Sequence, residues 1–450
     1  MFNTAIGIFQ MAVFYYMNLK IFITHILLLL LLPNLIYSQA NRIVSDSLST
    51  IEFSFVGDIM CHSTQFKFAQ VSKDSFNFKP NYREIKLYFD NSDVVVGNLE
   101  TVVEVSGVSY SGYPVFNTPK DFLEGLKYAG FNILTTANNH SFDINERGVL
   151  STIEHIKNYG MKNVGSYNSK TQRDSVIIFE TNRIKFAILS YTYGVNLYQI
   201  SKNKSYLVNK IDEEIIKNDI KNYRQKGAEV IIVAFHFGLE YSTEPNYYQS
   251  NIVKKTIDFG ADIIIGAHPH TLQPLEYFTT VNTNIDSGFV AYSIGNFISN
   301  QRWRYSDGGA VLNFSIEKNN LNGRISIEAV RYLPIWVFKG NTKNGSEYII
   351  LPTEVSERDS IPYYLSNEDL RMMNECSNDT HLILTKVSSK IEKDSIQKSK
   401  FRKIKRNYLA NGIFESHIPS FGMELDLLKI YSDTLNYMQQ DSVFHQQIYD

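Results

Sequence analysis

The stretch DFGADIIIGAHPH, residues 258–270, joins a short apolar run to two histidines and sets the expectation for how the chain folds. Its centre is rich in β-branched residues and follows a glycine, which predicts a buried strand. His268 and His270 then stand at the carboxyl end of that strand. Alternate residues of an extended segment point the same way, and Pro269 favours extension of the residue before it. The two imidazoles should therefore converge, an arrangement that suits a metal ion.

On both sides of this stretch, short apolar runs alternate with amphipathic segments between residues 51 and 314, which is the pattern of βα units. Several runs are apolar at every position, so both of their faces should be covered by helices or by another sheet. Helical segments end at glycines suited to a C-cap: Gly130, Gly160 and Gly260. The sequence predicts an α/β protein, a layered sandwich of central β-sheets flanked by helices. Strands are expected at residues 51–57, 93–100, 131–140, 184–192, 228–238, 261–270 and 288–297.

Composition limits the class of protein. With 450 residues, 44% of them hydrophobic, the chain can bury a sizeable core, and disorder is not expected. The 44 basic and 46 acidic side chains give a formal net charge of −2, so no nucleic-acid partner is indicated. Two cysteines, Cys61 and Cys376, do not make a disulfide framework.

The N-terminus has the features of a secretory signal. Lys20 precedes an apolar core, Ile21–Leu32, and Pro33–Ala40 supplies a helix breaker and small residues for cleavage. We expect residues 1–39 to be removed on export, with Met17 as an alternative start. The other interpretation is an uncleaved anchor, because the apolar residues before Met17 lengthen the run toward the roughly 20 residues of a spanning helix. Either way, the protein would be periplasmic, at the cell surface or extracellular.

The chain is expected to divide into a main domain, a β-extension and a small, mainly helical C-terminal region. These cover residues 48–335, 336–351 and 352–450. Apolar, strand-like runs indicate the extension, and a polar, helix-periodic sequence with a basic run at residues 398–406 indicates the C-terminal region.

Polar side chains follow five of the predicted strands at their carboxyl ends. They are Asp58, Asn98, Glu100, Asn139, His140, His236, His268 and His270. Because the carboxyl ends of parallel strands share one edge, where ligands bind, these side chains should meet. Each alone has an ordinary explanation: the aspartate and asparagines as turn residues, and His236 as a satisfied cleft residue. Together, oxygen and nitrogen donors suit two divalent ions such as Mn²⁺, Zn²⁺ or Fe²⁺, with Glu100 as the bridging carboxylate.

A further segment, NQRWRY at residues 300–305, has the aromatic and basic character to line the rim of this edge. Arg302 and Arg304 would suit carboxylate or phosphate groups, since a guanidinium binds both oxygens at once. The plainer interpretation makes them ordinary surface arginines.

Seven motifs in order carry a family resemblance: GDIM, NLE, TTANNHSFDINERG, VGSY, HFGLEY, DIIIGAHPHTLQPLE and YSIGNF. Over about residues 51–335 they resemble the CapA family, the capsule-synthesis proteins associated with poly-γ-glutamate. That family is similar to the calcineurin-like metallophosphoesterases. The resemblance therefore implies a metallophosphatase-like sandwich for the main domain.

The resemblance also implies a role for each matched residue. It makes metal ligands of Asp58, Glu100, Asn139, His236, His268 and His270. It makes His140 catalytic, either as proton donor to the leaving group or as stabiliser of the reacting oxyanion. The chain departs in two places from the motif pattern of the calcineurin-like metallophosphoesterases. Met60 stands where a histidine is expected, and GNLE replaces a Gly-Asp motif, so one metal would be held more weakly or by His62. The alternative for His62 is a loop or helix-start residue.

Such a centre would acidify a shared water and neutralise charge on a phosphoryl or carbonyl oxygen. The resemblance thus implies an exported protein of capsule or poly-γ-glutamate biosynthesis, a metal-dependent hydrolase or transferase that uses a metal-bound hydroxide. Its partners would be an anionic extracellular polymer such as poly-γ-glutamate, or a phosphoester, and membrane-bound capsule synthesis machinery. The alternatives are a non-catalytic module that binds polymer through the metal cleft and an assembly factor acting through residues 352–450.

Overall fold

The structure is a computed structural model that describes residues 47–410 except 282, 329 and 358–360. Residues Ser49–Lys400 make up one unit, and the described part of a second unit is residues 47–48 and 401–410. The signal predicted at residues 1–39 lies outside the described residues. Within the described part of the chain, no helix has the length and apolar character needed to cross a membrane.

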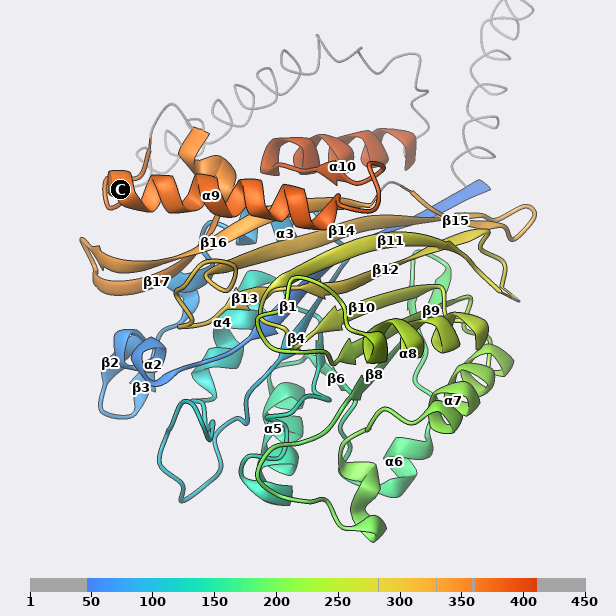
Figure 1. Ribbon diagram of the computed structural model, residues 1–450, viewed down its shortest axis with the longest axis horizontal. Helices are drawn as coiled ribbons and strands as arrows, with labels where there is room; N and C mark the ends of the chain where they lie inside the picture. Colours follow the sequence, from blue (N-terminus) through green and yellow to red (C-terminus); the bar gives the residue numbers. More distant parts are fainter. Residues whose placement is uncertain (1–46, 282, 329, 358–360, 411–450) are drawn as a thin grey trace, which may run out of the picture. The chain divides into compact units, whose positions relative to one another are not determined.

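Two β-sheets form the centre of the Ser49–Lys400 unit (Figure 1). The main path of the ten-stranded sheet runs in the order β17 (Gly345–Pro352), β16 (Arg331–Thr342), β14 (Gly308–Asn319), β1 (Leu48–Ile59), β4 (Val94–Leu99), β5 (Ile133–Thr135) and β6 (Lys162–Val164). Off this path lie β13 (Asn296–Ile298) on β1, β15 (Ile325–Ile327) on β14 and β18 (Glu392–Lys393) on β16. The six-stranded sheet runs β11 (Leu272–Thr279), β12 (Ser287–Ile294), β10 (Ile263–Ala267), β9 (Val230–His236), β8 (Ile184–Thr192) and β7 (Phe179–Thr181). A separate hairpin joins β2 (Gln70–Ser72) and β3 (Ser75–Phe76).

The ten-stranded sheet is parallel from β1 to its edge strand β6 and antiparallel at the opposite edge, whereas the six-stranded sheet has a parallel interior between two antiparallel edges. In the ten-stranded sheet β1, β4, β5 and β6 are parallel neighbours, and β16 and β17 form an antiparallel pair. In the six-stranded sheet β8, β9, β10 and β12 are parallel, while β11 and β7 run antiparallel to their neighbours. The carboxyl ends of the interior strands therefore share an edge in each sheet, which is where the polar residues were predicted.

An apolar core joins the two sheets and explains why the predicted strands are apolar on both faces. Phe53 of β1 packs edge-on against Phe186 of β8, with ring centroids 5.0 Å apart, and stacks on Phe314 of β14 at 5.2 Å. Phe289 of β12 packs against Phe314 at 5.1 Å. Side chains from one sheet therefore interdigitate with those of the other, as in other face-to-face sheet packings.

Helices flank the two sheets within the Ser49–Lys400 unit. They are α2 (Ser63–Ala69), α3 (Lys86–Phe89), α4 (Asp121–Ala129), α5 (Asn145–Asn158), α6 (Lys170–Asp174), α7 (Glu213–Gln225), α8 (Tyr247–Asp258) and α9 (Asn367–Leu384), with 3-10 helices η1 (Lys79–Tyr82), η2 (Lys202–Leu207) and η3 (Thr353–Glu357). Helix α10 (Ile396–Ala410) is the last element of the described chain. Leu126 of α4 shares a core with Val95 of the larger sheet. Ile216 of α7 and Ile252 of α8 share another with the smaller sheet.

The α/β prediction of sheets flanked by helices is confirmed. All seven predicted strand segments contain a strand, and the glycines predicted to end helices, Gly130, Gly160 and Gly260, all have positive φ. Such a left-handed backbone is the usual way to close a helix, and glycine adopts it without a Cβ penalty.

The first C-terminal helix packs directly on the larger sheet. Strand β16 continues across residue 335, and its hairpin with β17 meets Met373 of α9 in a core that includes Trp336 and Leu351 (Figure 1). Arg304 also reaches α9, with Nη2 2.8 Å from Asp379 Oδ1. The described part of the C-terminal region is mainly helical, as predicted, and removal of α9 would expose this apolar surface. The remainder of that region, residues 411–450, lies outside the described residues.

Candidate metal centre

Asp58, near the carboxyl end of β1, accepts hydrogen bonds from three directions. Its carboxylate oxygens lie 2.8 Å from Asn98 Nδ2, 3.2 Å from the backbone nitrogen of His268 and 3.0 Å from His270 Nδ1. Burial opposes the charged form of this carboxyl. The hydrogen bond and charge of His270 outweigh burial, with help from Asn98, and hold the pKa of Asp58 below its ordinary value. Asp58 is therefore a buried, negatively charged carboxylate that could serve as an oxygen ligand.

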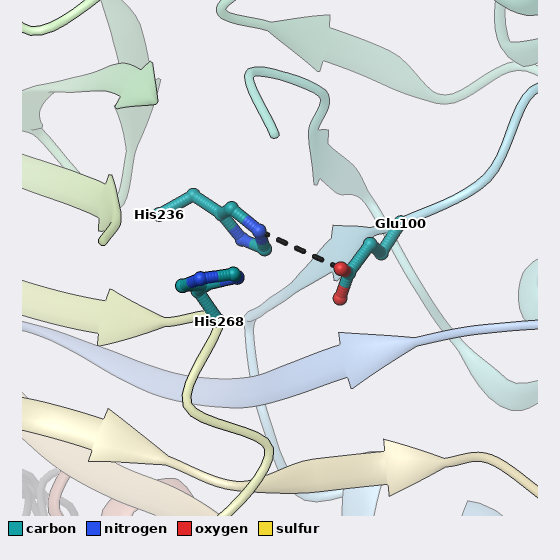
Figure 2. A group of neighbouring side chains, drawn as sticks. All are labelled: Glu100, His236 and His268. Atoms are coloured by element: carbon teal, nitrogen blue, oxygen red, sulfur yellow. Dashed lines mark ion pairs between the residues drawn. The ribbon is translucent and has the colours of Figure 1, made fainter. Parts of the chain in front are cut away.

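Glu100, just past β4, is a buried carboxylate that no hydrogen-bond donor among the described residues reaches. Its Oε1 lies 3.5 Å from His236 Nε2 and 3.9 Å from His270 Nε2. Figure 2 marks the pair of Glu100 and His236 with a dashed line. Burial first, and then the charge of Asp58, raise the pKa of Glu100 well above its ordinary value. A carboxylate in this position is costly unless a proton or a cation neutralises it.

His236 and His268 bring two imidazoles to the same point from the smaller sheet. Their ring centroids are 4.7 Å apart, and His236 Nε2 lies 2.8 Å from Asn139 Oδ1. Burial lowers the pKa of His236 well below its ordinary value and that of His268 to about 3. Nδ1 of His268 has no hydrogen-bond partner among the described residues. A neutral imidazole is the form that binds a metal ion, and His268 has a nitrogen left for one.

Two groups of three potential ligands share Glu100. One is Asp58, Glu100 and His270, and the other is Glu100, His236 and His268, with the ligand atoms of each group within 4.8 Å of one another. Asn139 joins the second group through its contact with His236. All six predicted metal ligands thus lie together. Because the carboxylate of Glu100 and Nδ1 of His268 are buried without donors or acceptors, the residues present fit a divalent cation.

His140 lies beside this centre on the loop after β5. Its Nδ1 is 2.8 Å from Asp143 Oδ2, and that carboxylate oxygen also accepts the backbone N–H of Phe116 at 2.8 Å. Because Asp143 is the acceptor, the proton of a neutral His140 sits on Nδ1, which leaves Nε2 for acid–base work. The Phe116 ring packs edge-on against the imidazole at 4.7 Å and fixes its plane.

The conformation of GAHPH differs from the extended one that was predicted. Strand β10 ends at Ala267, and both histidines have positive φ, 98° for His268 and 58° for His270. The prediction of extension was wrong because the tertiary structure competes with the local preference before proline. A tight loop lets the backbone N–H of His268 donate to Asp58 while the two side chains enter different ligand groups. The left-handed backbone at two non-glycine residues is strained.

Three residues near the centre were not singled out from sequence alone: Asp143, Glu240 and Asn296. Asn98 was expected at this edge but was not among the predicted metal ligands. Asn98 Nδ2 bridges Asp58 and His236, at 2.8 Å and 3.1 Å. Asn296 Oδ1 lies 3.2 Å from His270 Nδ1, and Glu240 forms a third ligand group with both histidines of GAHPH. The available signals were short spacings: Asp143 comes three residues after His140, and Glu240 four after His236.

Met60 and His62 follow Asp58 in the region where the sequence departs from the expected motif pattern. Met60 is buried. His62 begins α2, as its alternative interpretation predicted, and its Nδ1 lies 3.3 Å from the backbone nitrogen of Asn300. Burial lowers the pKa of His62 to about 4. His62 does not belong to a ligand group found among the described residues.

Fold and site together define a class: an α/β sandwich protein with a buried set of potential oxygen and nitrogen ligands at the carboxyl edges of two sheets. A family model described as Bacterial capsule synthesis protein PGA_cap matches residues 52–301, more than half of the chain. The chain belongs to this family of bacterial capsule synthesis proteins, which confirms the resemblance inferred from its motifs.

Two relatives are similar in sequence. The PGA biosynthesis protein CapA of Bacillus subtilis (strain 168) is 27% identical over 297 residues, 65% of this chain and 74% of that protein. The Capsule biosynthesis protein CapA of Bacillus anthracis is 26% identical over 245 residues, 53% of this chain and 58% of that protein. A solved structure of the NAD nucleotidase (NadN) of Haemophilus influenzae is similar with a TM-score of 0.39 and 13% identity, covering 81% of this chain and 61% of that one.

Proposed function

We propose that the protein is a metal-dependent hydrolase or transferase of capsule-polymer biosynthesis. The observation that carries the proposal is the position of Glu100, which belongs to two ligand groups at once and has no hydrogen-bond donor among the described residues. Two ligand sets joined by one carboxylate suit a pair of divalent ions acting on one substrate. Asp58 and His270 would hold one ion, and His236, His268 and Asn139 the other. Manganese, zinc and iron all accept such mixed donors.

The chain's own side chains supply the remaining chemistry. When bound, the ions would acidify a water molecule and polarise a phosphoryl or carbonyl oxygen. His140 belongs to none of the ligand groups, and Asp143 fixes its proton on Nδ1. Its Nε2 is then suited to pass a proton to a leaving group or to stabilise a developing oxyanion. Asn98 holds the side chains of Asp58 and His236 in place by contacting both.

The substrate and the place of action are part of the same proposal. The family and the names of both relatives support a capsule polymer, either an anionic chain such as poly-γ-glutamate or a phosphoester. The predicted signal supports export, with membrane-bound capsule synthesis machinery as a neighbour.

Metal analysis combined with a hydrolysis screen tests the proposal. We expect purified protein to contain divalent metal, and EDTA to remove activity toward p-nitrophenyl phosphoesters or a γ-linked glutamate polymer until Mn²⁺ or Zn²⁺ is restored. Protein that contains no divalent metal, and does not respond to added ions, would contradict it. His140→Ala should lose activity and keep its metal. If polymer binding survives in His140→Ala, is lost in His268→Ala and no turnover is found, the protein is a binding module.

A further inference from the structure

Four exposed aromatic side chains surround the candidate centre, and we call them the aromatic rim. They are Tyr113, Tyr193, Tyr241 and Trp303, with between 44% and 72% of each exposed. Each stands on a different loop: after β4, after β8, after β9 and after β13. Large apolar side chains left in water and gathered at a polar centre mark a ligand-contacting surface.

The rim is in direct contact with the candidate site. The distance between ring centroids is 4.7 Å for Tyr193 and His268. It is 6.0 Å for Tyr241 and His270, and 6.4 Å for Tyr113 and His140. Trp303 packs edge-on against Tyr241 at 5.4 Å. A molecule that reaches the centre would therefore meet aromatic faces from several directions.

The charged groups next to the rim do not favour a polyanion. Arg302 stacks over the buried ring of Trp336 at 4.9 Å and donates to the backbone carbonyl of Val337. Arg304 pairs with Asp379 on α9. Arg302 is therefore engaged in packing and Arg304 in an ion pair.

Beside the two histidines of GAHPH stands the exposed carboxylate of Glu240. The rim thus combines ring faces and phenol hydroxyls with an acidic group. A linear glutamate chain carries no ring that could stack on the aromatic side chains, so it would gain little from the rim.

We propose that the aromatic rim binds sugar rings, so that the substrate of the centre is a phosphoester carried by a saccharide. This rests on the proposed function and chooses between its two substrate classes. Tyrosine and tryptophan offer an apolar face for the C–H face of a sugar and a polar edge for its hydroxyls. Rings on four separate loops suit a chain of several sugars, of which only the phosphoester must enter the metal centre.

Tryptophan fluorescence measures this binding directly. The sequence has two tryptophans, Trp303 on the rim and Trp336 in the core, so a ligand on the rim should change the emission of Trp303 alone. The probes are cellohexaose, chitohexaose, mannohexaose, a γ-linked glutamate decamer and AMP, each titrated into the full chain with and without EDTA. We expect at least one hexasaccharide to give a saturable change, with or without metal, and the glutamate decamer to give none at the same concentrations.

Variants that leave the reporter in place locate the binding. Tyr241→Ala and Tyr113→Ala should each weaken saccharide binding about tenfold through loss of a stacking face, whereas Tyr241→Phe keeps its ring and should bind nearly as well. The control is Tyr128→Ala, an exposed tyrosine near the C-terminal end of α4, away from the carboxyl edge, which should not alter binding.

The proposal is overturned if no hexasaccharide binds, if the decamer or AMP binds while saccharides do not, or if saccharide binding is unchanged in both alanine variants. Because the rim is tested without catalysis, these outcomes are distinct from failure of the proposed function, which the metal analysis reports.

Discussion

The two sheets contribute different chemistry to one centre. The ten-stranded sheet supplies oxygen donors: Asp58, Glu100 and Asn139. The six-stranded sheet supplies nitrogen donors: His236, His268 and His270. Carboxylates alone suit hard ions such as Ca²⁺ and Mg²⁺, and imidazoles alone suit softer ones, so the mixed set exists only where the two sheets meet. The site is therefore a property of sheet packing, and each sheet carries half of it.

The chain itself joins the two halves at Gly295. This residue separates β12 of the smaller sheet from β13 of the larger one and has a φ of +70°. Its carbonyl oxygen accepts the backbone N–H of Asp58 at 3.0 Å. A Cβ added to Gly57 would lie 1.9 Å from that oxygen. The connection between the sheets thus depends on close backbone approach beside the first ligand.

The largest effect is expected from removing the shared oxygen ligand. Glu100→Gln should weaken binding of both ions by more than about 100-fold, because the substitution removes a ligand from each group. The metal-free variant should be at least as stable as the parent, since a buried, unpaired carboxylate is gone. Metal content and thermal unfolding after EDTA treatment measure the two effects. Unchanged metal content would show that Glu100 is not a ligand.

The second effect tests the connection between the sheets. Gly57→Ala should cost about 3 kcal/mol of unfolding free energy, because the new Cβ overlaps the Gly295 carbonyl and forces the sheets apart. Urea denaturation measures it. The matched control is Gly194→Ala, where an added Cβ meets nothing within 4 Å, and it should stay within about 0.5 kcal/mol. Equal stability of the two variants would contradict the close approach.

The third effect separates proton transfer from metal binding. Asp143→Asn should lower kcat about 10- to 100-fold, because an amide no longer holds the Nδ1 proton of His140 as a carboxylate does. Metal content should not change, and the pH–rate profile should shift. A drop in metal content together with kcat would instead mean that Asp143 supports the fold of the centre.

The smallest effect is expected beside the histidines that the six-stranded sheet supplies. Glu240→Gln removes an exposed carboxylate within 4.8 Å of ligand atoms on His268 and His270, and it should weaken metal binding by about tenfold at most. Calorimetric titration with Zn²⁺ or Mn²⁺ measures this. A loss of metal affinity as large as that of Glu100→Gln would make Glu240 a full ligand. The six-stranded sheet would then supply an oxygen donor as well as nitrogen donors.

Much of the architecture was predictable because it depends on local pattern. Apolar runs bounded by glycine and polar residues identified the parallel strands β1, β4, β5, β8, β9, β10 and β12 but not the short edge strand β6, and the polar residues at strand ends identified the six candidate ligands that the structure brings together. The positive φ of His268 was not predictable, because the acceptor of its N–H, Asp58, is 210 residues away. The contact between Trp303 and Tyr241 likewise joins loops that follow different sheets.

By itself, the sequence determined an α/β protein with oxygen and nitrogen donors at the ends of its strands, because strand periodicity and residue type are local properties of the chain. Only the tertiary structure decided that Glu100 is shared by two ligand groups, that Asp143 orients His140, that α9 packs on the larger sheet and that aromatic side chains surround the centre. These features depend on distances between segments far apart in sequence. Such distances are set by the packing of the two sheets and not by any local preference.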